Sequence, residues 1–107
     1  MKKRATLLLI FSIIIMLAAN LFAQAPVITT QPSWQGVIEG QTATFSVIAT
    51  GDTLTYQWYK NGIAITGATD SIYTTPATAL ADSGSLFSVK IVNNHGSDSS
   101  NTAELIV

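Results

Sequence analysis

Residues 54–65 read LTYQWYKNGIAI, and this stretch decides the fold class. Hydrophobic and polar side chains alternate from Leu54 to Trp58, which is the period of a β-strand with one buried face. Asn61 and Gly62 follow, and these two residue types tolerate the positive φ angles of a tight hairpin turn. Residues 63–65 then form a short returning strand. The stretch therefore predicts a β-hairpin.

Short alternating segments fill the rest of residues 24–107. Within residues 42–49, one face collects Ala43, Phe45, Val47 and Ala49, and hydroxyl side chains occupy most of the other face. The pattern recurs at residues 27–29, 36–38, 71–75, 87–92 and 103–107. Gly, Pro, Asn, Asp and Ser separate these segments, and none has a 3.6-residue period. About seven strands at this spacing predict an all-β, two-sheet antiparallel sandwich.

The first 23 residues differ from the rest in composition. Lys2, Lys3 and Arg4 precede an apolar run over residues 7–19 that only Ser12 interrupts, and small residues follow. This order is typical of a signal peptide for export. The run is shorter than the roughly 20 residues that a membrane-spanning helix needs, so an uncleaved membrane anchor is the weaker alternative.

Two cleavage positions compete at the end of this leader. Residues 23–25 have the small-x-small pattern, but a cut after Ala25 would leave Pro26 as the first mature residue, where its ring fits the peptidase poorly. We therefore predict a cut between Ala23 and Gln24. The chain then divides into a signal peptide at 1–23 and one domain at 24–107, with an expected address in the secreted medium, the periplasm or the outer cell surface.

The charge of residues 24–107 excludes some partners. Two lysines stand against six acidic residues, which gives a net charge of −4. Such a domain repels polyanions, so we expect no binding to nucleic acid and contact with membrane only through the export signal. The sequence has no cysteine, which leaves neither a lipid-attachment site nor a disulfide.

Three segments carry a resemblance to a known family. They read VITTQPSWQGVIEGQTATFSV, LTYQWYKNGIAITGAT and LADSGSLFSVKIVNNHGS, in this order. With these segments, residues 25–107 resemble the cysteine-free immunoglobulin-like domains of bacterial secreted and cell-surface proteins, near the intermediate set. The resemblance implies a Greek-key immunoglobulin-like sandwich. It says little about function, because this scaffold hosts many unrelated roles.

The same resemblance implies a core. Trp58 matches the family's strand-C tryptophan, and Val47 and Val89 take the positions of the two cysteines found in vertebrate members. Trp58 should then pack on a Val47–Val89 contact, with Phe45 and Phe87 also in the core. Phe87 occupies the family's tyrosine-corner position without a hydroxyl. Asp82 has no arginine to meet in residues 24–107, so we expect it to cap local backbone N–H groups.

The residues offer little for catalysis or metal binding. His95 is the only imidazole, it lies in a predicted turn over 93–96, and no cysteine or paired acids accompany it. Asp52 and Asp70 are isolated, without the spacing of a calcium or zinc site. We therefore expect no enzyme activity, no catalytic residues, no metal and no cofactor.

Two aromatic residues are the remaining candidates for partner contact. Tyr59 has outward parity beside Lys60, and Trp34 lies in a kink over residues 32–35. As an exposed pair they could stack on sugars or anchor a neighbouring domain; covering the edge of the sandwich is the other interpretation.

These patterns predict a non-catalytic module of an exported bacterial protein, a structural spacer or an adhesion and recognition domain. Its partner would be a protein or glycan at the cell surface, or neighbouring domains of a longer chain. The alternative is a carbohydrate-binding accessory module of a secreted polysaccharide-degrading enzyme. The last predicted strand finishes at Val107, as expected either of a free single domain or of the first piece of an interrupted gene.

Overall fold

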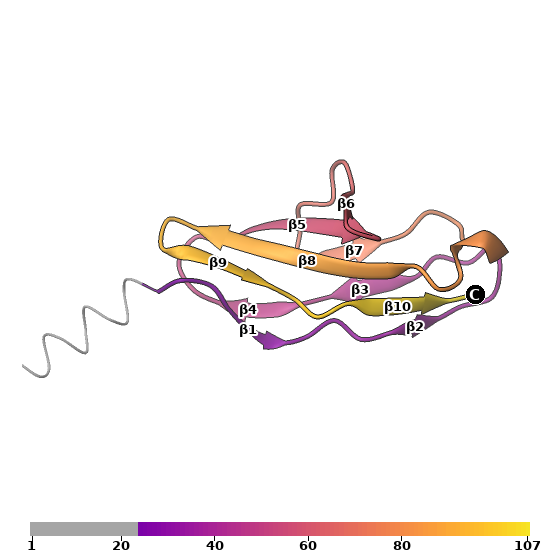
Figure 1. Ribbon diagram of the computed structural model, residues 1–107, viewed down its shortest axis with the longest axis horizontal. Helices are drawn as coiled ribbons and strands as arrows, with labels where there is room; N and C mark the ends of the chain where they lie inside the picture. The colour runs from indigo at the N-terminus through magenta and orange to yellow at the C-terminus, as the bar shows by residue number, and fades with distance from the viewer. Residues whose placement is uncertain (1–23) are drawn as a thin grey trace, which may run out of the picture.

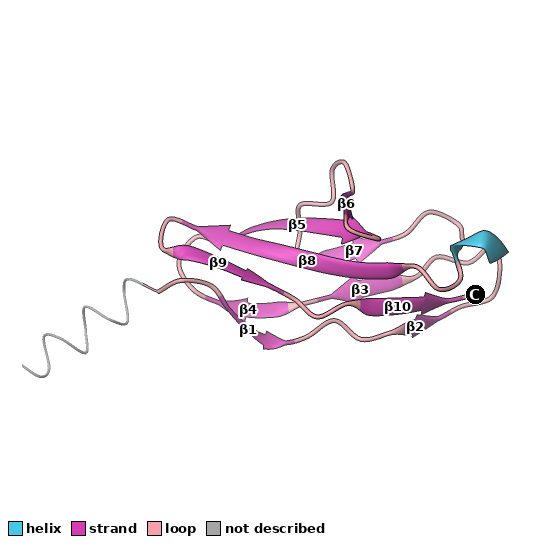
Figure 2. Ribbon diagram, viewed as in Figure 1, coloured by secondary structure: helices cyan, strands magenta, loops and turns pink. Residues whose placement is uncertain are grey.

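The computed structural model describes residues 24–107, which form two facing layers of β-strands (Figure 1). The signal peptide predicted at residues 1–23 lies outside the described residues. Figure 2 shows one short helical turn among the strands, the 3-10 helix η1 (Leu80–Asp82). Within the described range, no helix has the length and apolar character needed to cross a membrane.

The first layer is built on the chain between Thr44 and Thr50. Its first half pairs antiparallel with β7 and its second half with β1. The strands of this layer are β1 (Val27–Thr30), β4 (Ile48–Thr50), β3 (Thr44–Ser46) and β7 (Ile72–Thr74). The sequence predicts one strand here, and the structure divides it at Val47. The partner strand changes at that point, although Val47 still donates its backbone N–H to the Ser71 carbonyl at 3.0 Å.

The second layer is one larger sheet with β8 near its centre. Strand β8 pairs with β5 along six residues of register, which places Trp58 opposite Val89. In order across the sheet, the strands are β2 (Gln35–Gly36), β10 (Ala103–Ile106), β8 (Leu86–Asn93), β5 (Thr55–Lys60) and β6 (Ile63–Ala64), with β9 (Gly96–Ser99) also paired to β8.

One strand pair corrects the prediction of a wholly antiparallel sandwich. Strand β2 runs parallel to β10, with Gln35 beside Leu105 and Gly36 beside Ile106. The kink around Pro32 carries the chain from β1 in one layer to β2 in the other without reversing it. The chain therefore meets β10 running in the same direction.

Strand β9 is a second difference from the sequence-based expectation. Its residues, Gly96 to Ser99, include no hydrophobic side chain, so the alternation that predicts strands is absent. The turn at Asn94 and His95 was predicted correctly, and it folds the chain back so that backbone pairing with β8 forms β9. The position of β9 therefore depends on the turn that precedes it and not on a side-chain pattern.

The predicted hairpin is confirmed, and its turn is tied to the sheet. Asn61 and Gly62 have φ angles of 51° and 80°. The Asn61 Oδ1 accepts the backbone N–H of Leu86 at 2.8 Å, and Asn61 donates its own backbone N–H to the Leu86 carbonyl at 2.8 Å. An asparagine tolerates this left-handed backbone and supplies the extra acceptor.

The core lies between the layers and follows the predicted alternation. Each predicted inward position on β3, β8 and β10 is buried. The buried hydrophobic residues are Ala43, Phe45, Val47, Trp58, Ala68, Phe87, Val89, Ile91, Ala103 and Leu105. The Trp58 Nε1–H donates to the Asp70 carbonyl at 2.8 Å, so the buried indole keeps no unsatisfied donor.

Candidate interaction surfaces

Most aromatic rings of the domain face the core and cannot reach a partner. Phe45 and Phe87 stack with ring centroids 4.6 Å apart, and Tyr73 lies 5.9 Å from Phe87 and 6.4 Å from Trp58. Trp58 and Phe45 have no exposed surface. Tyr56 is half-buried against the same cluster. These rings stabilise the sandwich in place of a disulfide.

The structure separates the two rings predicted for partner contact. Trp34 precedes β2 and is 65 % exposed, whereas Tyr59 lies on β5 and is only partly exposed. Strands β10 and β8 lie between them in the sheet. With about 4.8 Å between adjacent strands, the rings stand on backbones some 14 Å apart. They do not form the pair that sequence reasoning considered.

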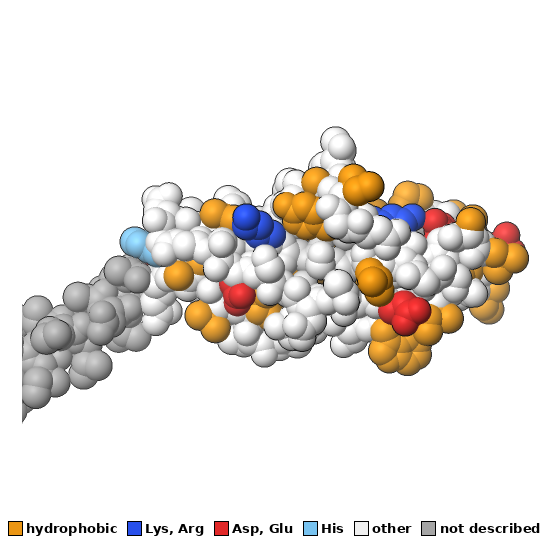
Figure 3. All heavy atoms as spheres, in the orientation of Figure 1, with side chains coloured by type: hydrophobic (Ala, Val, Ile, Leu, Met, Phe, Trp, Pro, Cys, Tyr) orange, Lys and Arg blue, Asp and Glu red, His pale blue; other side chains and the backbone are white. Residues whose placement is uncertain are grey.

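Trp34 belongs instead to an apolar patch on the outer face of β2, β10 and β8. Its other members are Ile106, which pairs with Gly36, and Leu86, which pairs with Glu104. The exposed fractions of Trp34, Ile106 and Leu86 are 65, 46 and 43 %. We call these three residues the Trp34 patch. Figure 3 shows hydrophobic side chains here, with an acidic group among them over β10.

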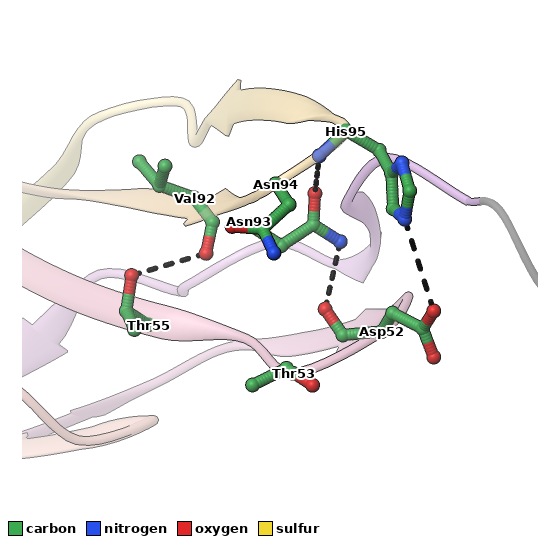
Figure 4. Close-up of a pocket in the computed structure, with 7 residues that line it drawn as sticks. All are labelled: Asp52, Thr53, Thr55, Val92, Asn93, Asn94 and His95. Carbon is green, nitrogen blue, oxygen red and sulfur yellow. Dashed lines mark hydrogen bonds and ion pairs between the residues drawn. The ribbon is translucent and has the colours of Figure 1, made fainter.

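A groove of about 290 Å³ lies at the opposite pole, where the described chain begins. Residues from two chain segments, 52–55 and 92–95, line it, and Figure 4 shows their side chains. They are Asp52, Thr53, Thr55, Val92, Asn93, Asn94 and His95. Thr53 has a φ of 43°, an uncommon angle for a β-branched residue, so the loop is held in one strained conformation by its surroundings.

Asn93 holds this groove together, a role that sequence reasoning missed. Its Nδ2 donates to the carbonyls of Gln24 at 2.8 Å and Asp52 at 2.7 Å. Its Oδ1 accepts the backbone N–H of His95 at 2.8 Å. The bond to His95 is local to the turn, but Gln24 and Asp52 lie 69 and 41 residues from Asn93, and no local motif signals these two contacts.

The groove lacks the geometry of a catalytic site. The His95 Nε2 lies 3.9 Å from the Asp52 carboxylate, too far for a hydrogen bond. The hydroxyl of Thr55, which lines the groove, donates to the Val92 carbonyl at 3.0 Å. Across residues 24–107, no hydroxyl is hydrogen-bonded to the imidazole as a nucleophile would be. The side chains here connect loops.

Acidic side chains do not converge elsewhere. Among the described residues, no group of three or more His, Cys, Asp or Glu side chains is placed to hold a metal ion. Asp52 lies at the groove, whereas Asp70 lies in the loop that accepts the Trp58 indole.

Asp82 caps the backbone as predicted and also forms an ion pair that the sequence did not reveal. Its Oδ2 accepts the backbone N–H of Ala79 at 2.9 Å at the start of η1, and its Oδ1 lies 2.9 Å from the Lys60 Nζ. The N–H of Ala79 and then the ammonium of Lys60 hold the pKa of Asp82 below its ordinary value. Lys60 stands 22 residues away in the chain, so only the fold brings the two together.

This arrangement predicts a pH-dependent contribution to stability. The folded-state pKa of Asp82 is lowered, so the stabilisation is fully present above the ordinary carboxyl pKa of about 3.9 and is lost as the pH falls below it. We expect the difference in urea midpoint between wild type and Asp82→Asn to be largest at neutral pH and to shrink in this acid range. Urea unfolding followed by circular dichroism, repeated from neutral pH to about pH 2.5, measures it.

Lys60→Gln is the matched control. It removes the ion pair but leaves the hydrogen bond from Ala79, which is the larger cause of the lowered Asp82 pKa. The stability of Lys60→Gln should therefore depend on pH more strongly than that of Asp82→Asn. A wild-type to Asp82→Asn difference that stays constant with pH would contradict the assignment.

The comparisons with known proteins agree with this architecture. A family model described as an immunoglobulin domain matches residues 25–101. The chain belongs to the immunoglobulin domain family. No curated protein sequence matches it.

Solved structures similar to this immunoglobulin domain include several from titin. The titin domains Z1Z2 in complex with telethonin share 32 % identity, with a TM-score of 0.67, over 79 % of this chain and 48 % of the titin chain. Titin M4 shares 23 % identity with a TM-score of 0.68, over 79 % of this chain and 97 % of that one. The tandem immunoglobulin repeats of Dlar share 23 % identity with a TM-score of 0.70, over 79 % of this chain and 47 % of theirs.

The last two similarities show the fold alone. The immunoglobulin domain spans about half the length of the titin Z1Z2 chain that it matches. Family members are generally non-catalytic, and no enzyme stands among these relatives.

Proposed function

We propose that this immunoglobulin domain is a non-catalytic module of an exported bacterial protein, near the intermediate set, which acts as a structural spacer or as an adhesion and recognition domain. One observation carries the spacer role. The described chain begins at one pole of the sandwich and β10 ends at the other (Figure 1). A module with this geometry adds its full length when it is joined to neighbours.

Pairing within the second layer suits such a module. The parallel pair β2–β10 joins the part of the chain near the entering strand to the strand that leaves at the far pole. Val37 extends this pair by donating its backbone N–H to the Ile106 carbonyl at 2.9 Å. Tension applied between the two ends of the domain would pull β2 and β10 along their length in opposite directions. The force would be shared by the hydrogen bonds between them, so several bonds must break together.

Removing one of these bonds tests the spacer role. Val37→Pro deletes the N–H donor, and we expect its unfolding force under end-to-end tension to fall clearly below that of the wild type. Single-molecule pulling of a polyprotein that contains the domain measures this force. Val37→Ala is the control, because it keeps the donor while removing the same half-buried side chain. Equal forces for the proline and alanine variants would overturn the proposed load path.

Export rests on the leader alone, and the contacts of the first described residues bear on where the leader would be cut. The Gln24 carbonyl is bound by Asn93, and Pro26 is buried. A Cβ added to Gly51 or Gly96 would lie 3.2 or 3.1 Å from Ala25 atoms, so Ala25 fits closely between two glycines. A cut after Ala25 would remove residues that contact the fold, which favours a cut between Ala23 and Gln24.

We therefore expect the exported product to begin at Gln24. Expression of the full sequence in a bacterial host, followed by fractionation and intact-mass analysis, measures this end. Blocking the leader by replacing Lys2, Lys3 and Arg4 with glutamate is the control and should leave the precursor in the cytoplasm. A product that begins at Pro26, or one that keeps residues 1–23 in the membrane, would contradict the cleavage proposal.

The proposed partners are proteins, including neighbouring domains. The titin Z1Z2 structure contains a protein partner, telethonin, and several relatives are tandem repeats. A carbohydrate-binding accessory module is the alternative function. It is less well supported, because Trp34 and Tyr59 stand on strands separated by β10 and β8 and give no common stacking platform.

A further inference from the structure

The Trp34 patch contains an exposed aromatic ring that lies against the backbone of β2. Trp34 is 65 % exposed, yet its ring lies over Gly36, where an added Cβ would be 3.1 Å from the indole Cζ3. The glycine thus lets the indole rest on the backbone of β2. Such a ring offers a large apolar surface to a partner, and tryptophan is among the residue types most enriched at binding hot spots.

The patch also has a defined shape and extent. Gly36 pairs with Ile106, and Leu86 pairs with Glu104 on the next strand, so the apolar side chains come from three adjacent strands. Ile38, which is 72 % exposed, extends β2 toward the pole beyond Gly36. This surface can receive one or two apolar side chains of an extended segment laid across the strands.

The charged side chains nearest the Trp34 patch are acidic. Glu104 points outward between Leu86 and Ile106, and Glu39 follows Ile38 in the chain. Lys60, on β5, is paired with Asp82. Lys90 lies four residues beyond Leu86 along β8, which places it roughly 13 Å from Leu86. At this distance, which exceeds a Debye length at physiological salt, Lys90 does little to neutralise Glu104.

We propose that the Trp34 patch binds a segment of another protein that places an apolar side chain against Trp34 and a lysine or arginine against Glu104. A second copy of this chain is a poorer match in charge, because residues 24–107 carry six carboxylates and two lysines, of which Lys60 is already paired with Asp82. A basic rim around an apolar centre complements this patch in both charge and polarity.

Two peptides test the proposal with the protein produced from the full sequence. One short capped peptide carries a central leucine flanked by lysines, and the other carries glutamates in place of the lysines. Isothermal titration should show that the lysine peptide binds about 10-fold more tightly than the glutamate peptide. Its affinity should fall as the salt concentration rises. Trp34→Ala should lower the affinity for the lysine peptide about 10-fold or more. Glu104→Gln should reduce the preference between the peptides to about 2-fold.

Two further variants separate this patch from general hydrophobic binding. Gly36→Ala keeps the indole but displaces it, and should weaken the lysine peptide. Ile63→Ala removes an exposed side chain of β6 (74 % exposed) far from the patch, and should have no effect. Unchanged urea midpoints establish that the variants are folded.

Three results would overturn the proposal. They are equal affinity for both peptides, affinity that Trp34→Ala leaves unchanged, and retention on soluble polysaccharide that Trp34→Ala abolishes while Glu104→Gln does not. The proposed spacer role does not depend on this experiment, because the pulling measurement on Val37→Pro tests it separately.

Discussion

Replacing Trp58 with alanine is expected to destabilise the domain by about 4 kcal/mol, near the middle of the range for deleting a buried tryptophan. The side chain has no exposed surface and lies opposite Val89 in the register of β5 and β8. Its loss also leaves the Asp70 carbonyl without the Nε1–H donor 2.8 Å away. Because small domains have net stabilities of roughly 5–15 kcal/mol, the variant should be close to unfolding at physiological temperature.

Urea unfolding followed by tryptophan fluorescence and circular dichroism measures this loss. Trp34→Ala is the matched control, since it removes the same side chain from an exposed position and should change the stability by no more than about 0.5 kcal/mol. Trp58→Phe should fall between the two, because it refills much of the volume without the indole donor. If Trp58→Ala and Trp34→Ala had similar unfolding midpoints, the assignment of Trp58 to the core would be wrong.

A disulfide between positions 47 and 89 is expected to stabilise the domain by about 3 kcal/mol. Val47 and Val89 are 4 and 1 % exposed and come from the two facing layers. In the resemblance described above they occupy the positions of the two cysteines. Cross-linking them closes a long loop in the unfolded chain and lowers its entropy. The double variant Val47→Cys, Val89→Cys should therefore be more stable oxidised than reduced.

Comparing the oxidised and reduced forms of one variant cancels the effect of losing the two valines. Mass spectrometry establishes whether the bond forms, and urea unfolding gives the stability difference. Val47→Cys alone is the control and should have the same stability in both conditions. Failure of the double variant to oxidise while folded would mean that the two positions are farther apart than a disulfide permits.

Much of the fold could be predicted from short-range patterns. Alternation placed Phe45 and Val89 in the core and left Lys90 outside, because successive side chains of a strand point to opposite faces. The Asn61-Gly62 turn was equally clear, since few residue types tolerate its backbone angles. Strand β9 escaped prediction, because a Gly-Ser-Asp-Ser segment has no hydrophobic pattern and depends on its partner for pairing.

The candidate surfaces were harder to predict. Parity indicated that Tyr59 faces outward, and the kink over residues 32–35 suggested an exposed Trp34, but the distance between the two rings depends on strand order, which neither pattern contains. Asn93 gave a signal only for the turn that it shares with His95, because its other two partners, Gln24 and Asp52, belong to distant parts of the chain.

For this protein, the sequence by itself determined most of the strands, the buried face of those strands and the tight turn, since these depend on neighbours one or two residues apart. Only the tertiary structure decided that β2 runs parallel to β10, that Lys60 meets Asp82, and that Trp34 lies over Gly36 beside Ile106 and Glu104. These contacts join residues far apart in the chain. They form because packing two layers around one core fixes which strands become neighbours.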